Sequence, residues 1–181
     1  MIRKMLPLRM TSVVVRGFGR GSTDLGIPTA NLDRDAITLS DSNGSHNLTF
    51  DDLPTGIYWG FCRIGEAGSN DGDEGTVYKT AVSIGYNPTY KNEKKTIEPH
   101  LIAPTKDQRR HASSCGESLF GEFYDKPIRL SVVGYLRPEL PFEGLDKLIA
   151  AIKNDIVETE KFGSEPTPKI LAEHQWVASS A

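Results

Sequence analysis

Residue types that suit phosphate binding lie together at 17–31, in the stretch GFGRGSTDLGIPTAN. Three alternate glycines, Gly17, Gly19 and Gly21, leave a run of backbone N–H groups unobstructed by side chains, and such runs form concave sites for anions. The stretch matches neither common nucleotide motif, because no Walker-loop lysine follows Gly26 and the glycine spacing is one residue short of a dinucleotide fingerprint. The alternative interpretation is a flexible surface turn.

Two oxygen ligands follow the glycine run. Pro28 disfavours helical backbone at the residue before it, so the chain should enter this segment extended. Thr29 and Asn31 then point to the same side. Their hydroxyl and amide oxygens are hard, neutral donors, and Mg²⁺ in nucleotide sites takes few protein ligands and completes its shell with phosphate oxygens and water. The pair therefore suggests a magnesium–nucleotide site.

A carboxylate and an imidazole lie on one face of an alternating run at 95–102. The alternation places Thr96, Glu98 and His100 on the same side of an extended chain. Taken alone, Glu98 is an exposed strand carboxylate, although Pro99 restricts its backbone and its neighbours are apolar. His100 suits either a hydrogen-bonded barrel histidine or the wall of a ligand site.

Short β-like runs must position these residues. Strands are predicted at 8–15, 56–64, 76–84, 95–102 and 128–136. One strong helical period predicts an amphipathic helix over about 143–161 with its apolar stripe in the core. The stripe residues are Phe142, Leu145, Leu148, Ile149, Ile152 and Ile156. Five or six antiparallel strands and one terminal helix favour a mainly β fold built as a small closed barrel.

Three long polar connections, 33–53, 65–75 and 103–121, are predicted to be loops. The chain of 181 residues should form one domain over 1–162, followed by a loosely docked C-terminal tail at 163–181 that contains two prolines.

The composition of the chain limits the kinds of molecule that it is expected to bind. The net charge of −3 gives no reason to expect nucleic acid, and no apolar run is long enough to span a bilayer. Cys62 and Cys115 lack the spacing of a metal or redox motif. We expect a soluble cytoplasmic monomer; the basic segment 1–23 is a weaker indication of mitochondrial targeting, and a first strand is the simpler interpretation.

Five segments resemble riboflavin kinases and occur in the order found in that family. They are the stretch at 17–31, TGIYWG at 55–60, VSIGYNP at 82–88, IEPH at 97–100 and VGYLRPE at 133–139. Phe142, Leu145, Leu148 and Asp155 also match the closing helix of the family, so that the resemblance covers about 8–161. The chain looks most like the eukaryotic, single-function form.

The resemblance implies a six-stranded antiparallel Greek-key barrel with a C-terminal helix. It also implies transfer of the γ-phosphate of ATP to the ribityl 5′-hydroxyl of riboflavin, which yields FMN and ADP. Glu98 matches the catalytic carboxylate and would act as general base, because an alcohol is a poor nucleophile and needs a group that orients it and accepts its proton.

The same resemblance assigns binding residues. Thr29 and Asn31 would hold Mg²⁺, with Zn²⁺ or Mn²⁺ as alternatives. The residues implied at ATP are Gly17, Gly19, Arg20, Gly21, Ser22, Thr23, Pro28, Thr29, Asn31, Leu130 and Tyr135. Those implied at the flavin are His100, Leu101, Phe123, Tyr124 and Arg137, with Phe123 and Tyr124 in a loop that closes over the isoalloxazine ring.

One departure from the family pattern concerns the phosphates. Many members place a lysine where this chain has Thr23, so Arg20 or backbone N–H groups would take over that contact. The alternative function is a non-catalytic flavin-binding β-barrel protein. Such a protein could lose Glu98 or the Thr29/Asn31 pair, and this chain keeps both, together with Arg137.

Overall fold

The computed structural model describes residues 2–16, 28–86, 94–111 and 123–180. The strands are β1 Leu8–Val15, β2 Asn31–Leu32, β3 Thr38–Ser40, β4 Gly56–Ile64, β5 Val77–Gly85, β6 Thr96–Ile102 and β7 Pro127–Arg137. The helices are η1 Ile2–Lys4, η3 Phe50–Asp52, η5 Gln108–His111, α2 Leu145–Gly163 and α3 Pro168–Ala178.

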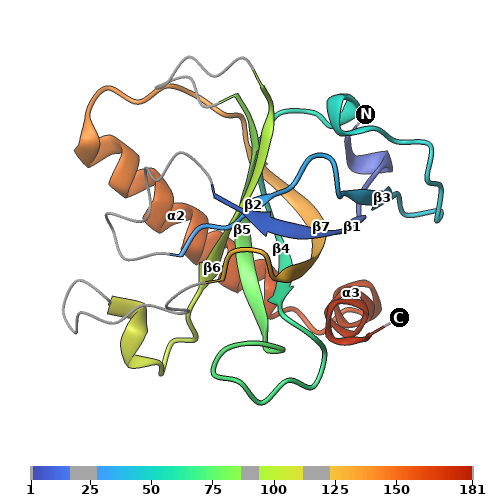
Figure 1. Ribbon diagram of the computed structural model, residues 1–181. Coiled ribbons are helices and arrows are strands. Elements are labelled where there is room, and N and C mark those ends of the chain that lie inside the picture. The colour runs from blue at the N-terminus through green and yellow to red at the C-terminus, as the bar shows by residue number, and fades with distance from the viewer. Residues whose placement is uncertain (1, 17–27, 87–93, 112–122, 181) are drawn as a thin grey trace.

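The strands form a nearly closed antiparallel barrel (Figure 1). Their order is β2-β1-β7-β4-β5-β6, with β3 paired to β1. Strands β4, β5 and β6 follow one another, and β7 returns beside β4, which is the Greek-key arrangement. An isolated antiparallel bridge between Thr29 and His100 brings the chain before β2 against β6. The predicted Greek-key barrel is therefore confirmed.

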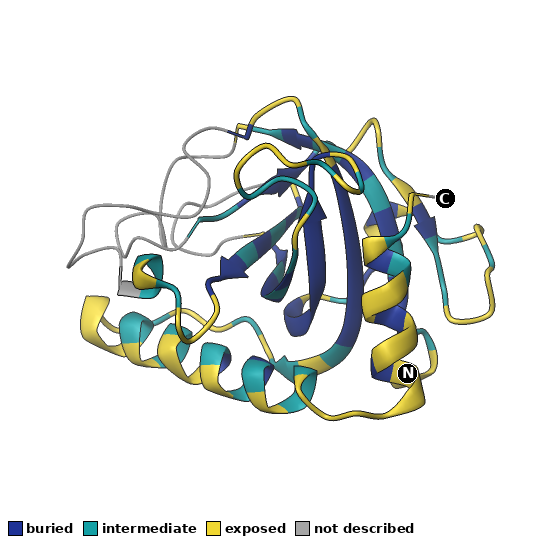
Figure 2. Ribbon diagram, turned by 90° about the horizontal axis from the view of Figure 1, so that it is seen from below, coloured by how far each residue is buried: buried dark blue, intermediate teal, exposed yellow. Residues whose placement is uncertain are grey.

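Alternating side chains divide the strands into an inner and an outer face. On β1 every second residue is buried, and Leu8, Met10 and Val14 belong to the main core cluster inside the barrel. Strand β4 is buried along its whole length because its outer face carries a second cluster, in which Trp59 and Phe61 pack with residues of β7 and α3. Figure 2 shows the resulting layers, with dark blue strands beside the partly exposed helices.

The predicted strands agree with the structure to within one residue at each end, but two predicted loops contain additional elements. The 33–53 connection holds β3 and η3, and the 103–121 connection holds η5. These elements are too short to show a period in the sequence. They depend on contacts such as the pairing of β3 with β1 and the reciprocal bonds between Thr49 and Asp52 at the start of η3.

Helix α2 forms where it was predicted, but its apolar stripe is not a core stripe. Its buried residues are Asp155 and Thr159, whereas Leu145 at its first turn is 65% exposed. The other stripe residues on the helix are only partly buried. In Figure 2 the helix lies along one side of the barrel with much of its length in the colours of intermediate and exposed residues. The prediction that the stripe packs in the core was therefore wrong.

The predicted loose tail is a second docked helix, α3. Thr167 caps its first turn by accepting a hydrogen bond from the backbone N–H of Ile170, and Pro168 occupies a first-turn position where a missing N–H costs nothing. One of the two prolines in the tail that was predicted to dock loosely therefore starts a helix. Ile170 and Val177 are buried against the outer face of the sheet.

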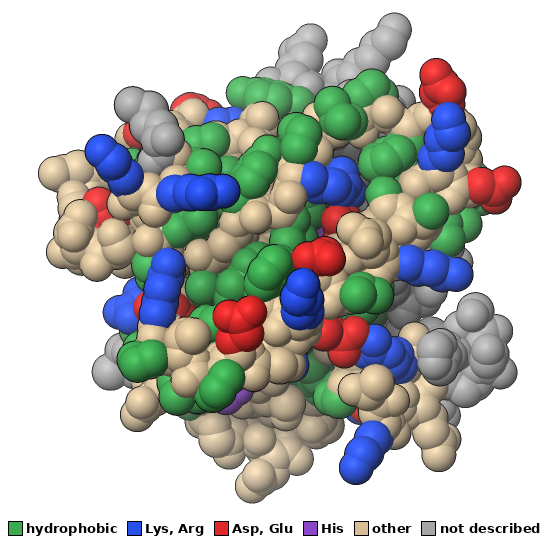
Figure 3. Space-filling view, turned by 180° about the vertical axis from the view of Figure 1, so that it is seen from behind, with side chains coloured by type: hydrophobic (Ala, Val, Ile, Leu, Met, Phe, Trp, Pro, Cys, Tyr) green, Lys and Arg blue, Asp and Glu red, His purple; other side chains and the backbone are tan. Residues whose placement is uncertain are grey.

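The surface carries charges of both signs. On the face shown in Figure 3, basic and acidic side chains are interspersed with hydrophobic ones, as the small net charge predicts. Among the described residues, no helix combines the length and the apolar character needed to cross a bilayer.

Candidate functional site

The β2–β6 seam, where residues 28–32 lie against 97–101, brings the predicted chemical groups together. The backbone N–H of Ala30 donates to the carbonyl of Pro99 at 3.0 Å, and that of Leu101 donates to the carbonyl of Pro28 at 2.9 Å. Thr29 and His100 are therefore a cross-strand pair without direct backbone bonds, the kind in which side chains lie closest.

The same antiparallel register places Asn31 opposite Glu98, two residues further along each chain. Ala30 and Leu101 point into the barrel core, so the four polar side chains of the seam stand on the outer face. Alternation in the sequence predicted that Thr29 and Asn31 share a side of their segment. It also predicted that Glu98 and His100 share a side of theirs, and closure of the barrel brings the two pairs together.

Glu98 occupies a largely desolvated position. Burial, opposed by hydrogen bonds from the side chains of Thr96 and Asn31, raises the pKa of its carboxyl group above the ordinary value. The negative charge of Glu139 acts in the same direction as burial. A carboxylate of raised pKa is a stronger base than a surface carboxylate, and the bond from Asn31 limits its orientation. These features suit Glu98 to accept a proton.

His100 is held as a neutral imidazole. Burial, reinforced by the positive charge of Arg137, lowers its pKa to about 4. Its Nδ1 lies 3.1 Å from Oγ1 of Thr29. A neutral ring can accept the threonine proton, which turns the lone pairs of Oγ1 toward other partners. His100 therefore supports Thr29 and is poorly suited to be a second base.

Arg137, at the end of β7, faces helix α2. Its Nε and Nη2 donate to the two carboxylate oxygens of Asp155, both at 2.8 Å, and its guanidinium lies 5.3 Å from the ring centre of Phe142. Glu139 follows two residues later and accepts a hydrogen bond from the backbone N–H of Tyr86 at 3.3 Å.

Two groups of this neighbourhood were missed as site residues in the sequence. Glu139 affects the charge environment of Glu98, and Asp155 holds Arg137. Both residues lie in segments that resemble the family, and this resemblance was the feature of the sequence that could have pointed to them.

Other predicted ligand residues lie away from the seam side chains. Leu101, Phe123 and Leu130 are buried in the core cluster inside the barrel. Tyr124 stacks on Phe123 with ring centres 5.6 Å apart and carries the guanidinium of Arg16 at 4.4 Å. Leu101, Phe123 and Leu130 thus lie in the barrel interior, whereas the side chain of Glu98 stands on the outer face.

Two predicted residues at the nucleotide have intermediate positions. Tyr135 is 39% exposed and contacts the ring of Tyr58 edge-on, so part of this residue is accessible from solvent. Pro28 is part of the seam through its carbonyl. The predicted phosphate-binding residues Gly17, Gly19, Arg20, Gly21, Ser22 and Thr23 lie outside the described residues.

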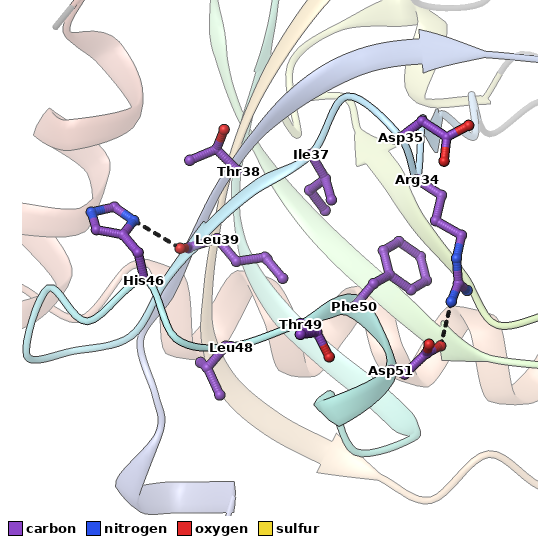
Figure 4. Close-up of a pocket in the computed structure, with 10 residues that line it drawn as sticks. All are labelled: Arg34, Asp35, Ile37, Thr38, Leu39, His46, Leu48, Thr49, Phe50 and Asp51. Carbon is purple, nitrogen blue, oxygen red and sulfur yellow. Dashed lines mark hydrogen bonds and ion pairs between the residues drawn. The ribbon is translucent and has the colours of Figure 1, made fainter.

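A cavity of about 410 Å³ lies in a different part of the molecule, in the 34–51 segment (Figure 4). Ile37, Leu39 and Phe50 form its apolar side, and Arg34 reaches across to Asp51. Its remaining lining residues are Asp35, Thr38, His46, Leu48 and Thr49. None of the predicted site residues that the structure describes lines this cavity, so it is separate from the seam.

The donors of the seam suit a hard cation. Thr29 offers a hydroxyl oxygen, and Asn31 retains its carbonyl oxygen because its amide group must donate to the carboxylate of Glu98, which only accepts. Neutral oxygen donors of this kind fit Mg²⁺ that also binds phosphate oxygens. Among the described residues no cluster of three histidine, cysteine or acidic side chains could hold a metal by itself.

Comparisons with known proteins identify the family of the chain. The family model described as "Flavokinase: Riboflavin kinase" matches residues 4–162. The riboflavin kinase of Mus musculus is 40% identical over 158 residues, which cover 87% of this chain and 82% of the relative. The riboflavin kinase of Homo sapiens is 40% identical over 156 residues, which cover 86% of this chain and 81% of the relative.

A solved structure, riboflavin kinase from Trypanosoma brucei, has the same fold at 20% identity, with a TM-score of 0.58 over 97% of this chain and 91% of that one. The match of the family model to most of the chain, together with the two mammalian relatives, shows that this chain belongs to the riboflavin kinase family.

Proposed function

We propose that the chain transfers the γ-phosphate of ATP to the ribityl 5′-hydroxyl of riboflavin, forming FMN and ADP, at the outer face of the β2–β6 seam. The observation that carries this proposal is the register of the seam. It sets Thr29 beside His100 and Asn31 beside Glu98, so that oxygen ligands and a base share one face.

Glu98 acts as the general base. It orients the 5′-hydroxyl and accepts its proton while the oxygen attacks the γ-phosphorus, and ADP leaves from the opposite side. Desolvation and the nearby charge of Glu139 raise the pKa of Glu98, which strengthens it as a base. The bond from Asn31 fixes the carboxylate beside the proposed phosphate site.

Thr29 and Asn31 would hold the divalent cation that accompanies ATP, and His100 keeps the hydroxyl of Thr29 in place. When bound, such a cation neutralises charge on the phosphates of the nucleotide. We propose Mg²⁺, with Zn²⁺ or Mn²⁺ as alternatives. The glycine run at 17–26 would bind the phosphates through its backbone N–H groups.

The flavin would lie between the end of β7 and helix α2. Arg137 offers a guanidinium there, His100 forms part of the wall, and Tyr135 offers an exposed ring on the adenine side. The half-exposed apolar stripe of α2 gives the flavin ring an apolar surface. Contacts from Leu101, Phe123 and Leu130 stay predictions, because their interior positions do not support them.

A direct assay tests the proposal. Purified protein is incubated with ATP, Mg²⁺ and riboflavin, and FMN is separated by chromatography; we expect FMN to form in proportion to ADP. A non-catalytic flavin-binding barrel would instead bind riboflavin, seen as quenching of flavin fluorescence, and form no FMN. We also propose that the protein works as a cytoplasmic monomer, which fractionation and sedimentation would check.

A further inference from the structure

Asp155 on helix α2 is a buried carboxylate that forms a two-pronged ion pair with Arg137. The side chain of Asp155 is 7% exposed and that of Arg137 is 24% exposed. The paired bonds, from Nε to Oδ1 and from Nη2 to Oδ2, have the same length of 2.8 Å. Parallel bonds of this kind fix both the position and the plane of a guanidinium group.

The guanidinium of Arg137 is also close to residues that follow β7, among them Phe142, whose ring centre lies 5.3 Å away. The positive charge of Arg137 acts on the buried ring of His100, which is hydrogen-bonded to Thr29 in the seam. The third nitrogen, Nη1, donates to the carbonyl of Pro138 at 3.3 Å. Arg137 is thus held in place by helix α2, and its positive charge acts on the seam.

The stability of the fold does not by itself account for this pair. Asp155 and Thr159 are the buried residues of helix α2, and a buried ion pair is often no more stabilising than apolar residues of similar volume. What the paired bonds do supply is a fixed orientation for the guanidinium of Arg137.

We propose that Asp155 is a positioning residue for riboflavin: it holds the guanidinium of Arg137 in the orientation that meets the flavin. Helix α2 would therefore determine substrate affinity through one ion pair as well as through its apolar surface. This inference rests on the proposed role of Arg137 at the flavin.

The matched control is a second ion pair of the same geometry on helix α3. Nε and Nη2 of Arg9 donate to the two oxygens of Glu173 at 3.0 and 2.9 Å, and the side chain of Glu173 is 4% exposed. This pair joins a helix to the barrel as the Asp155 pair does, but α3 packs on β7 and β4 and has no part in the proposed site.

The experiment measures the riboflavin dissociation constant by fluorescence quenching, the KM values for riboflavin and ATP, kcat, and the thermal unfolding midpoint. We expect Asp155→Asn to weaken riboflavin binding by about tenfold or more, with little change in the KM for ATP, because two charge-assisted bonds to Arg137 are weakened. Asp155→Glu should recover part of the loss. Glu173→Gln should lower the unfolding midpoint and leave riboflavin binding unchanged.

A charge exchange separates positioning from stability. Combining Arg137→Asp with Asp155→Arg restores an ion pair between strand and helix but moves the guanidinium onto α2. We expect the unfolding midpoint to recover relative to each single variant, while riboflavin binding stays weak.

Equal riboflavin affinity in Asp155→Asn and Glu173→Gln would overturn the inference, as would recovery of riboflavin binding in the exchanged pair. If the unaltered protein binds riboflavin but forms no FMN, the proposed kinase activity fails, and the binding measurements still decide the role of Asp155.

Discussion

Glu98 can be tested as a general base by replacing only its ionisable oxygen. Glu98→Gln keeps the shape and one oxygen that accepts hydrogen bonds but cannot accept the proton, and general-base assistance is typically worth about 10² to 10⁴ in rate. We expect kcat to fall by that order, with changes of only a few-fold in the affinities for ATP and riboflavin. Steady-state kinetics and fluorescence quenching measure the two effects separately.

The pH dependence gives a second readout of Glu98. A base must be deprotonated to work, and the pKa of Glu98 is raised above its ordinary value of 4.5, so the acidic limb of kcat should lie at higher pH than for a surface carboxylate. This limb should disappear in Glu98→Gln. If the variant kept a saturating rate close to that of the parent, Glu98 would not be the base.

A substitution of Thr29 tests whether this residue binds the divalent cation. Thr29→Ala removes one oxygen ligand, so activity should require more Mg²⁺ while riboflavin binding changes little. Thr29→Ser keeps the oxygen and serves as the control. A titration of activity against Mg²⁺ compares the three proteins, and superimposable curves for Thr29→Ala and the parent would remove Thr29 from the metal site.

For single residues, the sequence predicted which side chains share a face within one strand, but not which residues meet between strands. Alternation in the sequence placed Thr29 with Asn31 and Glu98 with His100, because side-chain direction in a strand is a local property. The pairing of the two sets depends on barrel closure, which local sequence does not encode. Asp155 shows the same limit, since its partner Arg137 lies on another element.

At the scale of elements, helix α2 contains a polar group with no partner. Thr159 is fully buried, and its hydroxyl has no hydrogen-bond partner among the described residues. An unsatisfied buried hydroxyl costs about 1 to 3 kcal/mol, so Thr159→Val should raise the free energy of unfolding by an amount of that order. Denaturant unfolding measures it.

Thr80 on β5 provides the control for this prediction. It is equally buried, but its hydroxyl donates to the carbonyl of His100 at 2.8 Å. Thr80→Val should therefore lower the free energy of unfolding, by about 0.5 to 1.5 kcal/mol. A loss of stability in both variants would mean that the Thr159 hydroxyl is satisfied in solution.

A strand or helix could be predicted from the sequence when its own residues specify it, and not when a distant partner does. Strands such as Leu8–Val15 and Gly56–Ile64 were located because β-branched and apolar residues mark a buried strand. Strand β3 was missed because three residues show no period and the strand is specified by its partner, β1. The period of α2 gave its position, but the burial of its face depends on what packs against it.

At the scale of the whole molecule, α3 fastens the outer face of the barrel through arginine side chains. Arg129 donates to the carbonyl of Trp176 at 2.7 Å, and its guanidinium lies 3.8 Å from the ring centre of that tryptophan. Arg63 donates to the carbonyls of Ala178 and Ser179 at 2.9 and 2.8 Å. Cations at a helix C-terminus satisfy its last carbonyls and complement its dipole, so this contact ends the helix as well as docking it.

If α3 is docked on the barrel, a substitution in its buried face should lower the free energy of unfolding, which a loosely attached tail would not do. Ile170 is 7% exposed and packs in the outer cluster with Trp59 and Phe61, whereas its neighbour Leu171 is 58% exposed. Ile170→Ala should lower the free energy of unfolding by about 2 to 5 kcal/mol, as large-to-small changes in cores do. Leu171→Ala should change it little.

Because α3 packs on β7 and β4 and the proposed site lies at the β2–β6 seam, KM values at a temperature where both variants are folded should match those of the parent. Equal stability of the two variants would show that α3 is detached in solution and that the outer face of the barrel does not need it.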